Sequence, residues 1–340
     1  FFFTQTTAYE IRLSLVGSEM CIRDSVYGQY ERPGSTSAQF LKIDISPAAA
    51  AMGGSYYSVA SGATALYYNP AAIASMDKKF DVVFNKTSWF ADIDHDYSAV
   101  AYNYGRYGSF GLLLTRLITD EMKVRTPMQP DGTGETFFAG SYRLGFGYAK
   151  KMTDRVNFGG TINYIFISLF RDFKQEAATI ELSADYDVGI RGMRFSMKIG
   201  NFGSSVKFVN EIYELPTNFS FGLSGLILDS EKNYLLGSSS INKPNDGPPI
   251  GLVGFEYGIN KMIFLRGGYN LGHSKATWST GAGVKFNLYN QLISADISFN
   301  DYSSLGLSLI HISEPTRLRR IAFSGVCLKK KGGGGGGGGG

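Results

Sequence analysis

Residues 276–288 read ATWSTGAGVKFNL, and this stretch indicates the fold because its apolar and polar side chains alternate with a period of two. One face carries Ala276, Trp278, Ala282, Val284, Phe286 and Leu288, and the other carries Thr277, Ser279, Gly281, Gly283, Lys285 and Asn287. Successive side chains of a β-strand point to opposite faces, so this alternation is typical of a strand with one apolar face. The stretch predicts a strand that separates an apolar from a polar environment.

The same pattern recurs along most of the chain. It is clear in residues 138–148, 156–166 and 193–201, and no helical stripe of comparable length interrupts it. We therefore predict an all-β fold of about thirteen strands. The predicted strands cover residues 80–90, 96–105, 107–118, 136–151, 155–171, 178–189, 193–202, 217–229, 231–243, 249–259, 260–271, 276–287 and 291–302.

The connections between these strands alternate in length. Tight turns such as Gly105-Arg106 alternate with longer polar connections such as residues 118–135 and 203–216. This layout favours a transmembrane antiparallel up-and-down β-barrel of the bacterial outer membrane, with lipid around it. The meander, the strand lengths and aromatic residues at strand ends support it, whereas a soluble β-sandwich or propeller is the alternative. The strand-end aromatics are Trp89, Phe90, Tyr102, Tyr104, Phe170, Phe173, Tyr257, Tyr289 and Tyr302.

Both ends of the chain resemble a sequencing-library adapter translated from opposite DNA strands. Back-translation of LVGSEMCIRDS, residues 15–25, gives a sequence whose complementary strand reads as residues 307–317. We expect residues 1–25 and 307–340, including the poly-Gly tail, to be adapter-derived. A native first strand and a native glycine tail are the alternative. Since single-chain bacterial barrels have even strand numbers, we expect about 14 strands, the last one lost or replaced after Gly306.

The charge and cysteine content change once these flanks are set aside. The 340 residues carry a formal charge of +4 and two cysteines, whereas residues 26–306 hold 25 basic residues, 25 acidic residues and no cysteine. A neutral chain gives nucleic-acid binding no electrostatic basis, and thiol chemistry is excluded. No G-x-S-x-G motif occurs, and we interpret Asp92, Asp94, His95 and Asp96 as a polar surface loop rather than a calcium site. We predict no enzymatic activity, no cofactor and no metal.

The segment before the first predicted strand has a different character. Residues 26–78 contain a run of small residues at 48–51, whereas the barrel is expected to occupy residues 79–306. Proline disfavours a helical residue before it and can begin a short helix itself. We predict that this compact segment folds inside the lumen as a plug. The candidate plug or gating residues are Met52, Gly53, Gly54, Asn69, Pro70 and Ala71.

The stretch SPAAAAMGGSYYSVASGATALYYNPAAIASM, with TSWFADIDHDYSAVAYNYG after it, resembles the N-terminal signature of the PorV/PorQ family of outer-membrane barrels. The resemblance continues through GIRGMRFSMKIGNFG to KPNDGPPIGLVGFEYGINKMIFLRGGYNLG. It implies a fourteen-stranded barrel with an N-terminal plug. For the family it also implies a role in type IX secretion, with exported proteins bearing C-terminal signals and secretion-apparatus subunits as partners.

Several basic residues fall on the polar faces of the predicted strands and are expected to point into the lumen. They are Arg143, Arg194, Lys198, Arg266 and Lys285. They could select anionic cargo, or they could solvate the lumen in pairs with Glu181, Asp185, Glu256 and Asp296. The first functional hypothesis is a barrel that handles exported protein at the cell surface. The alternative is a channel of the FadL type that admits a hydrophobic small molecule past the plug.

Overall fold

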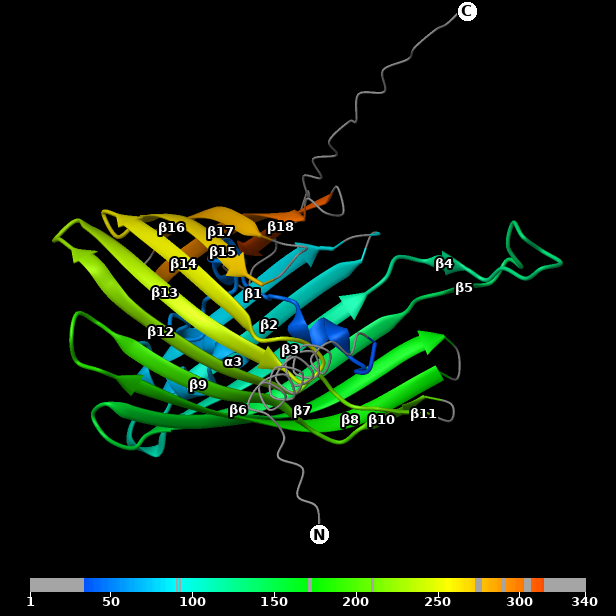
Figure 1. The fold of residues 1–340 in the computed structure, drawn as a ribbon, viewed down its shortest axis with the longest axis horizontal. Coiled ribbons are helices and arrows are strands. Elements are labelled where there is room, and N and C mark those ends of the chain that lie inside the picture. Colours follow the sequence, from blue (N-terminus) through cyan, green and yellow to red (C-terminus); the bar gives the residue numbers. More distant parts are fainter. Residues whose placement is uncertain are drawn as a thin grey trace, which may run out of the picture.

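The computed structural model describes residues 34–89, 91, 93–170, 173–208, 211–272, 277–288, 291–302 and 307–314. The fold is all-β and antiparallel, as predicted, and most of its strands form one large sheet (Figure 1). No helix in these residues is long and apolar enough to span a membrane. The helices are η1 (Gln39–Lys42), α2 (Pro47–Ala51), η2 (Gly62–Thr64), α3 (Ala65–Tyr68), η3 (Pro70–Ser75) and η5 (Gly105–Tyr107). The strands are β1 (Phe80–Ser88), β2 (Asp94–Asn103), β3 (Ser109–Ile118), β4 (Met122–Lys123), β5 (Thr136–Phe137), β6 (Gly140–Lys151), β7 (Val156–Phe170), β8 (Phe173–Asp187), β9 (Arg194–Gly203), β10 (Val206–Phe208), β11 (Glu211–Tyr213), β12 (Asn218–Asp229), β13 (Asn233–Pro244), β14 (Ile250–Ile259), β15 (Ile263–Leu271), β16 (Trp278–Leu288), β17 (Gln291–Tyr302) and β18 (Leu307–Glu314).

Each predicted strand corresponds to one strand of the large sheet. Neighbours in the sheet follow the chain, with the small hairpins β4–β5 and β10–β11 inserted into two of the long loops. The last strand, β18, pairs with β17 on one side and with β1 on the other, so the strand order closes on itself. Strand β18 lies within the flank that the sequence assigns to an adapter. Strand pairing carries no information about the origin of that segment, so its assignment stays a prediction.

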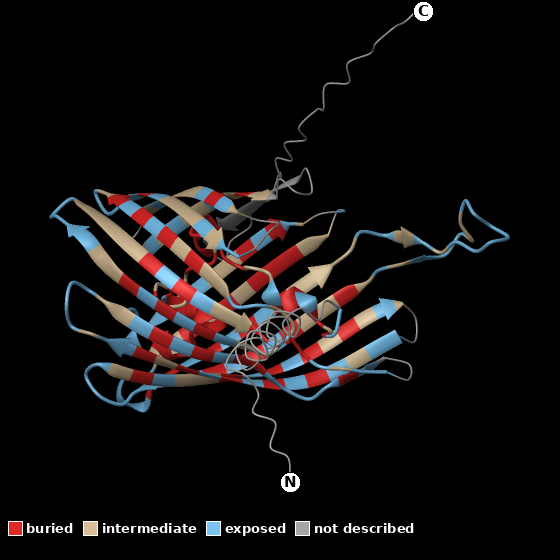
Figure 2. Ribbon diagram, in the orientation of Figure 1, coloured by how far each residue is buried: buried red, intermediate tan, exposed pale blue. Residues whose placement is uncertain are grey.

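The predicted alternation of faces is visible as alternating burial along the strands (Figure 2). In β6, Leu144 is 55% exposed, whereas its neighbour Arg143 is 1% exposed. Phe110, Leu112 and Leu114 of the neighbouring strand β3 are exposed in the same way. Because every second side chain of a strand points inward, the apolar residues form an outer band and the polar residues line the interior.

Aromatic side chains gather on the outside near the short turns. The rings of Tyr102 and Tyr104 lie 6.1 Å apart, and those of Tyr104 and Tyr107 lie 5.5 Å apart. Phe110 and Tyr148 extend the group to β3 and β6, with a ring separation of 5.1 Å. Such a cluster is typical of the interfacial edge of a membrane barrel. Phe90 and Tyr289, two of the aromatic residues named from the sequence, lie outside the described residues.

The polar cluster near the start of β2 differs from its prediction. Asp94, His95 and Asp96 do not form a surface loop, because the ladder with β1 and β3 extends to Asp94. Asp94 forms an ion pair with Lys86 at 2.8 Å, while His95 is buried and faces inward. Asp92 lies outside the described residues. No group of three or more metal-ligating side chains occurs in the described part of the chain.

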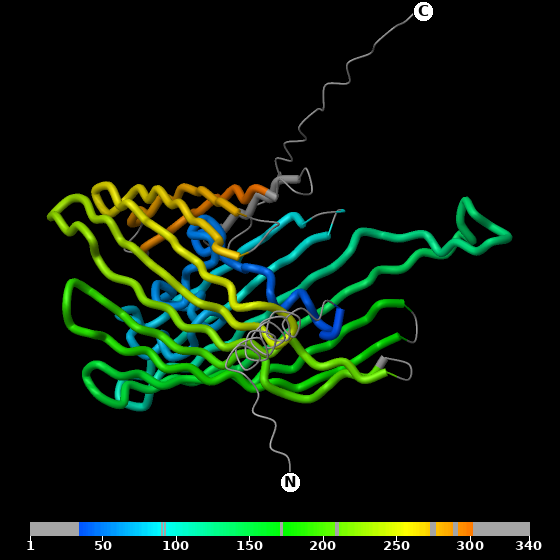
Figure 3. The backbone as a smooth tube through the Cα atoms, in the orientation of Figure 1, coloured from blue at the N-terminus to red at the C-terminus, as the bar shows by residue number. Residues whose placement is uncertain are grey.

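Residues 34–78, the described part of the N-terminal segment, run through the interior of the barrel (Figure 3). Helix α2 contacts β15, β16 and β17, and η3 contacts β6, β7 and β8 on another part of the wall. The segment starts near the long loops, where Ser37 N donates to Glu214 O, and ends near the short turns, where Asn103 Nδ2 donates to Met76 O. Its buried side chains form the main apolar core with Tyr97, Leu113 and Ala149 of the wall.

Candidate functional site

A cavity of about 820 Å³ lies between the N-terminal segment and the barrel wall. Its lining includes loop residues such as Asp246 and Pro248, and strand ends near the long loops such as Asn201 and Asn300. None of the short-turn residues that the structure describes lines it. The cavity therefore belongs to the long-loop end of the barrel. The packed core of the N-terminal segment separates it from the short-turn end.

Buried ion pairs form one wall of the cavity. Arg143 Nη2 lies 2.9 Å from Glu181 Oε2, and Lys198 Nζ lies 3.1 Å from the same oxygen. Thr161 Oγ1 donates to this oxygen at 3.0 Å. Both cations also lie over the ring of Tyr67, at 5.3 Å for Arg143 and 5.5 Å for Lys198, and Lys198 donates to the Tyr67 backbone carbonyl. The network therefore attaches the N-terminal segment to the wall.

The other predicted lumen charges lie apart from this network. Arg194 pairs with Asp185 at 2.7 Å, and Arg266 pairs with Glu256 at 2.6 Å and with Asp296. Neither group lines the cavity. Lys285 is half-exposed near the turn between β16 and β17 and belongs to none of these networks. The structure therefore brings only Arg143 and Lys198, of the five basic candidates, to the cavity.

Two of the predicted plug residues end helix α2 and reach the wall. Gly53 and Gly54 have φ angles of 65° and 80°, and Gly54 N donates to Ala49 O at 2.9 Å. A left-handed glycine is a common end of a helix, because it lacks the Cβ that makes this conformation costly. Both glycines line the cavity, whereas Met52 is fully buried against Gly254 of β14.

The remaining plug candidates lie at the opposite end of the segment. Asn69 has a non-helical backbone with φ −154° and ψ 86°, as the following proline requires, and Pro70 begins η3. Asn69 Nδ2 donates to Asp185 Oδ1 at 3.3 Å, and Ala71 N donates to Ser183 Oγ at 2.8 Å. Asn69 and Ala71 therefore anchor the segment to β8, and none of the three residues lines the cavity.

Asp246, which lines the cavity, binds the start of the N-terminal segment. Lys42 Nζ donates to Asp246 Oδ1 at 2.6 Å, and Thr36 and Gln39 donate to its other oxygen. Sequence reasoning missed Asp246, and it also missed Asp44, Tyr57 and the asparagines of the wall. None of these residues belongs to a recognisable sequence motif, and only their position along the chain could have pointed to them. The asparagines alternate with outward apolar residues close to the long loops.

Asp44 lines the cavity and accepts a hydrogen bond from Tyr68 Oη at 3.1 Å. Burial raises the pKa of its carboxyl from 3.8 to about 6, although the Tyr68 hydrogen bond opposes this. The folded state therefore binds more protons than the unfolded state between about pH 4 and pH 6. Asp44 consequently favours folding at low pH, and this contribution declines as pH rises through that interval.

Replacement of Asp44 by asparagine should remove this part of the pH dependence. We expect the free energy of unfolding of the wild type, relative to Asp44→Asn, to decrease between pH 4 and pH 6 and to level off above pH 6. Urea unfolding followed by tryptophan fluorescence across this range measures the difference. Asp131→Asn, in the exposed loop of the β4–β5 hairpin, is the control and should keep the wild-type profile. If the free energy of unfolding of Asp44→Asn changed with pH in the same way as that of the wild type, the expectation would be wrong.

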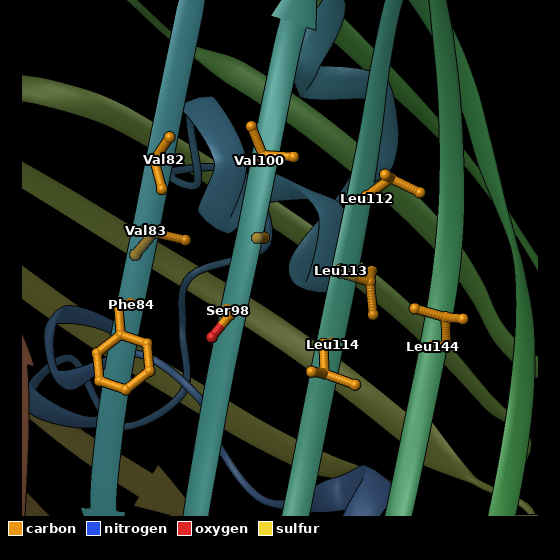
Figure 4. Close-up of a pocket in the computed structure, with 10 residues that line it drawn as sticks. Val82, Val83, Phe84, Ser98, Val100, Leu112, Leu113, Leu114 and Leu144 are labelled. Atoms are coloured by element: carbon orange, nitrogen blue, oxygen red, sulfur yellow. The ribbon is translucent and has the colours of Figure 1, made fainter. Parts of the chain in front are cut away.

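A second, smaller hollow of about 300 Å³ lies on β1, β2, β3 and β6 (Figure 4). Val82, Leu112, Leu114 and Leu144 line it, and each of them is exposed by more than 40%. The hollow therefore faces outward and belongs to the apolar outer band. It contains none of the charged or amide side chains that line the inner cavity.

The strands close into an antiparallel barrel that encloses an inner segment, with the cavity at its long-loop end, and solved barrels share this fold. The toluene transporter TodX of Pseudomonas putida has a similar structure, with a TM-score of 0.52 and 13% identity over 78% of this chain and 95% of TodX. The toluene transporter TbuX of Ralstonia pickettii has a TM-score of 0.50 and 14% identity over 80% of this chain and 98% of TbuX. No protein-family model and no curated protein matches the chain. At these identities the likeness shows the fold alone.

Proposed function

We propose that the protein is a non-enzymatic channel of the bacterial outer membrane that admits small, largely apolar molecules. The observation that carries this proposal is the cavity at the long-loop end, bounded by the barrel wall and the N-terminal segment. Ligand sites are typically concave, mostly apolar and of this size. The outward apolar band is the surface that outer-membrane lipid would cover.

The structural neighbours support the same function. Two of them are described as toluene transporters, and a TodX variant with a TM-score of 0.52 is described as a monoaromatic hydrocarbon channel. The cavity offers apolar side chains to such molecules, namely Leu41, Ile43, Tyr57, Ile250 and Leu252. In this arrangement the N-terminal segment acts as the plug, and a ligand that enters from the long-loop side meets it first.

Filling the cavity from β14 should reduce uptake. Ile250 and Leu252 line the cavity, whereas Val253 lies on the other face of the same strand. We expect Ile250→Trp to lower the uptake of radiolabelled toluene, by cells that display the protein in their outer membrane, by about tenfold. Val253→Trp should leave uptake unchanged. Equal uptake by Ile250→Trp and the wild type, at equal amounts of folded protein, would refute passage through this cavity.

The secretion function implied by the PorV/PorQ resemblance remains the second candidate. The observation that favours it is the β4–β5 hairpin, which extends well beyond the barrel (Figure 1) and exposes Met128 by 93%. Such an arm could contact an exported protein or a secretion-apparatus subunit. Specific retention of a C-terminal cargo domain by the purified barrel, lost when the hairpin is removed, would favour secretion over small-molecule uptake.

A further inference from the structure

We infer that the cavity recognises a neutral ligand that carries several hydroxyl groups on an apolar body, such as an aryl glycoside. This inference rests on the proposed channel function and narrows its substrate class. Its basis is a set of five asparagines that line the cavity, which we call the amide belt. The amide belt consists of Asn201, Asn218, Asn242, Asn270 and Asn300.

Strand register places the amide belt at one level of the wall, near the long loops. Asn218 of β12 pairs with Gly200, next to Asn201, and Asn218 Nδ2 donates to Asn242 Oδ1 at 3.3 Å. Leu252 of β14 pairs with Asn270 of β15. Further along, Ser279 of β16 pairs with Asn300 of β17. The amide groups therefore follow the inner wall from β9 to β17.

The amide belt has hydrogen-bonding capacity that the described protein atoms do not use. The Oδ1 atoms of Asn201, Asn218, Asn270 and Asn300 have no hydrogen-bond partner among the described residues. Asn201 and Asn300 are only 4% and 9% exposed. Buried polar groups in folded proteins are nearly always paired, and an unpaired carbonyl is costly. These oxygens are closed off from the cavity, so the groups that a ligand can reach are the amide NH₂ groups of Asn242, Asn270 and Asn300, which donate to no described residue. Ligand hydroxyl oxygens can accept from these NH₂ groups, whereas a hydrocarbon cannot.

The charges of the cavity favour a neutral ligand. Among the described residues, three basic and three acidic side chains line it, and each has a partner within the protein. Lys42 pairs with Asp246, and Arg143 and Lys198 pair with Glu181. Asp44 accepts the hydroxyl of Tyr68. A charged ligand would have to break one of these contacts, while a hydroxylated neutral ligand would not.

On the other side of the cavity, the N-terminal segment adds apolar and aromatic side chains to the paired charges of Lys42 and Asp44. The N-terminal segment contributes Leu41, Ile43 and the half-buried ring of Tyr57, which face the same space as the amide belt. A ligand with an aromatic or alkyl part can therefore pack against the segment while its hydroxyl groups reach the wall. The volume of about 820 Å³ lies in the usual range for sites that hold a small molecule.

The experiment compares toluene with phenyl β-glucoside, which share an aromatic ring and differ in the hydroxylated sugar. Cells that display the full chain are tested for uptake of each radiolabelled compound, and the purified barrel in a sugar-free detergent is tested for glucoside binding by equilibrium dialysis. We expect Asn218→Leu with Asn242→Leu to weaken glucoside binding at least tenfold. Asn287→Leu, exposed near the short turns, is the matched control and should bind as the wild type does.

The outcomes separate the two proposals. Uptake of toluene without binding of the glucoside by the wild type would overturn this inference and leave the channel function standing. Failure of both compounds to enter, with folded protein in the membrane, would overturn the channel function itself. Unchanged glucoside binding in the double variant would also overturn the inference. If the double variant does not fold, the comparison of toluene with phenyl β-glucoside on the wild type still tests the inference.

Discussion

Alanine at Gly268 is expected to destabilise the folded protein by about 1–3 kcal/mol, the usual cost of overpacking a tightly packed site. A Cβ at this position of β15 would lie 2.1 Å from Gly53 N and 2.2 Å from the carbonyl carbon of Met52. Both are backbone atoms, so rotation of a side chain cannot relieve the clash. The inner segment or the strand must move instead.

The neighbouring residue provides a matched control. A Cβ at Gly267 would lie 4.0 Å from its nearest neighbour, Ser279 O, so Gly267→Ala should leave stability nearly unchanged. Urea unfolding of both variants in detergent, followed by the fluorescence of the two tryptophans, measures the difference. Equal midpoints for the two variants would show that the segment does not depend on this close approach.

The same argument extends around the barrel. A Cβ at Gly159 would lie 2.7 Å from Ala71 N, one at Gly254 2.7 Å from Met52 O, and one at Gly281 2.6 Å from the Ala51 side chain. These glycines belong to β7, β14 and β16, on different parts of the wall. The wall therefore contacts the segment at backbone distance on several sides.

The sequence predicted the wall far better than it predicted the cavity. A period of two assigns each strand residue to a face, which is why Arg143 and Lys198 were expected inside and Leu144 outside. Such a pattern says nothing about register, and register decides that both cations meet Glu181. Nor does it say that Arg194 and Arg266 lie in separate groups away from the cavity.

The contacts of the N-terminal segment with the wall could not be predicted from the sequence, for a different reason. Its small residues indicate close packing, but the partners of that packing are glycines of distant strands, such as Gly268 for Gly53. Asp44 and Asp246 carry no motif, since each is defined by a long-range contact. Asp94 was assigned to a loop because local polarity outweighed the ladder that continues β2 to that residue.

Glutamine at Glu181 is expected to destabilise the protein by about 3–5 kcal/mol, the usual cost of removing one partner from a buried ion pair. Glu181 is 1% exposed and is the shared partner of Arg143 and Lys198. Glutamine keeps the shape and can still accept from Thr161, but it leaves two cations without their counter-charge. Asp94→Asn, which breaks the exposed pair with Lys86, should cost no more than about 1 kcal/mol.

A triple replacement tests whether the loss comes from the unpaired cations. Removing all three charges, with Arg143→Met, Glu181→Leu and Lys198→Met, eliminates the attraction together with the cost of burying the ions, and such exchanges are often neutral or stabilising. We therefore expect the triple variant to unfold at higher urea than Glu181→Gln. If the two variants unfold together, the network would stabilise the fold mainly by packing around Tyr67. If the triple variant is more stable than Glu181→Gln, burying the three charges costs free energy of folding. Such a cost is expected of charged groups that serve the cavity rather than the stability of the fold.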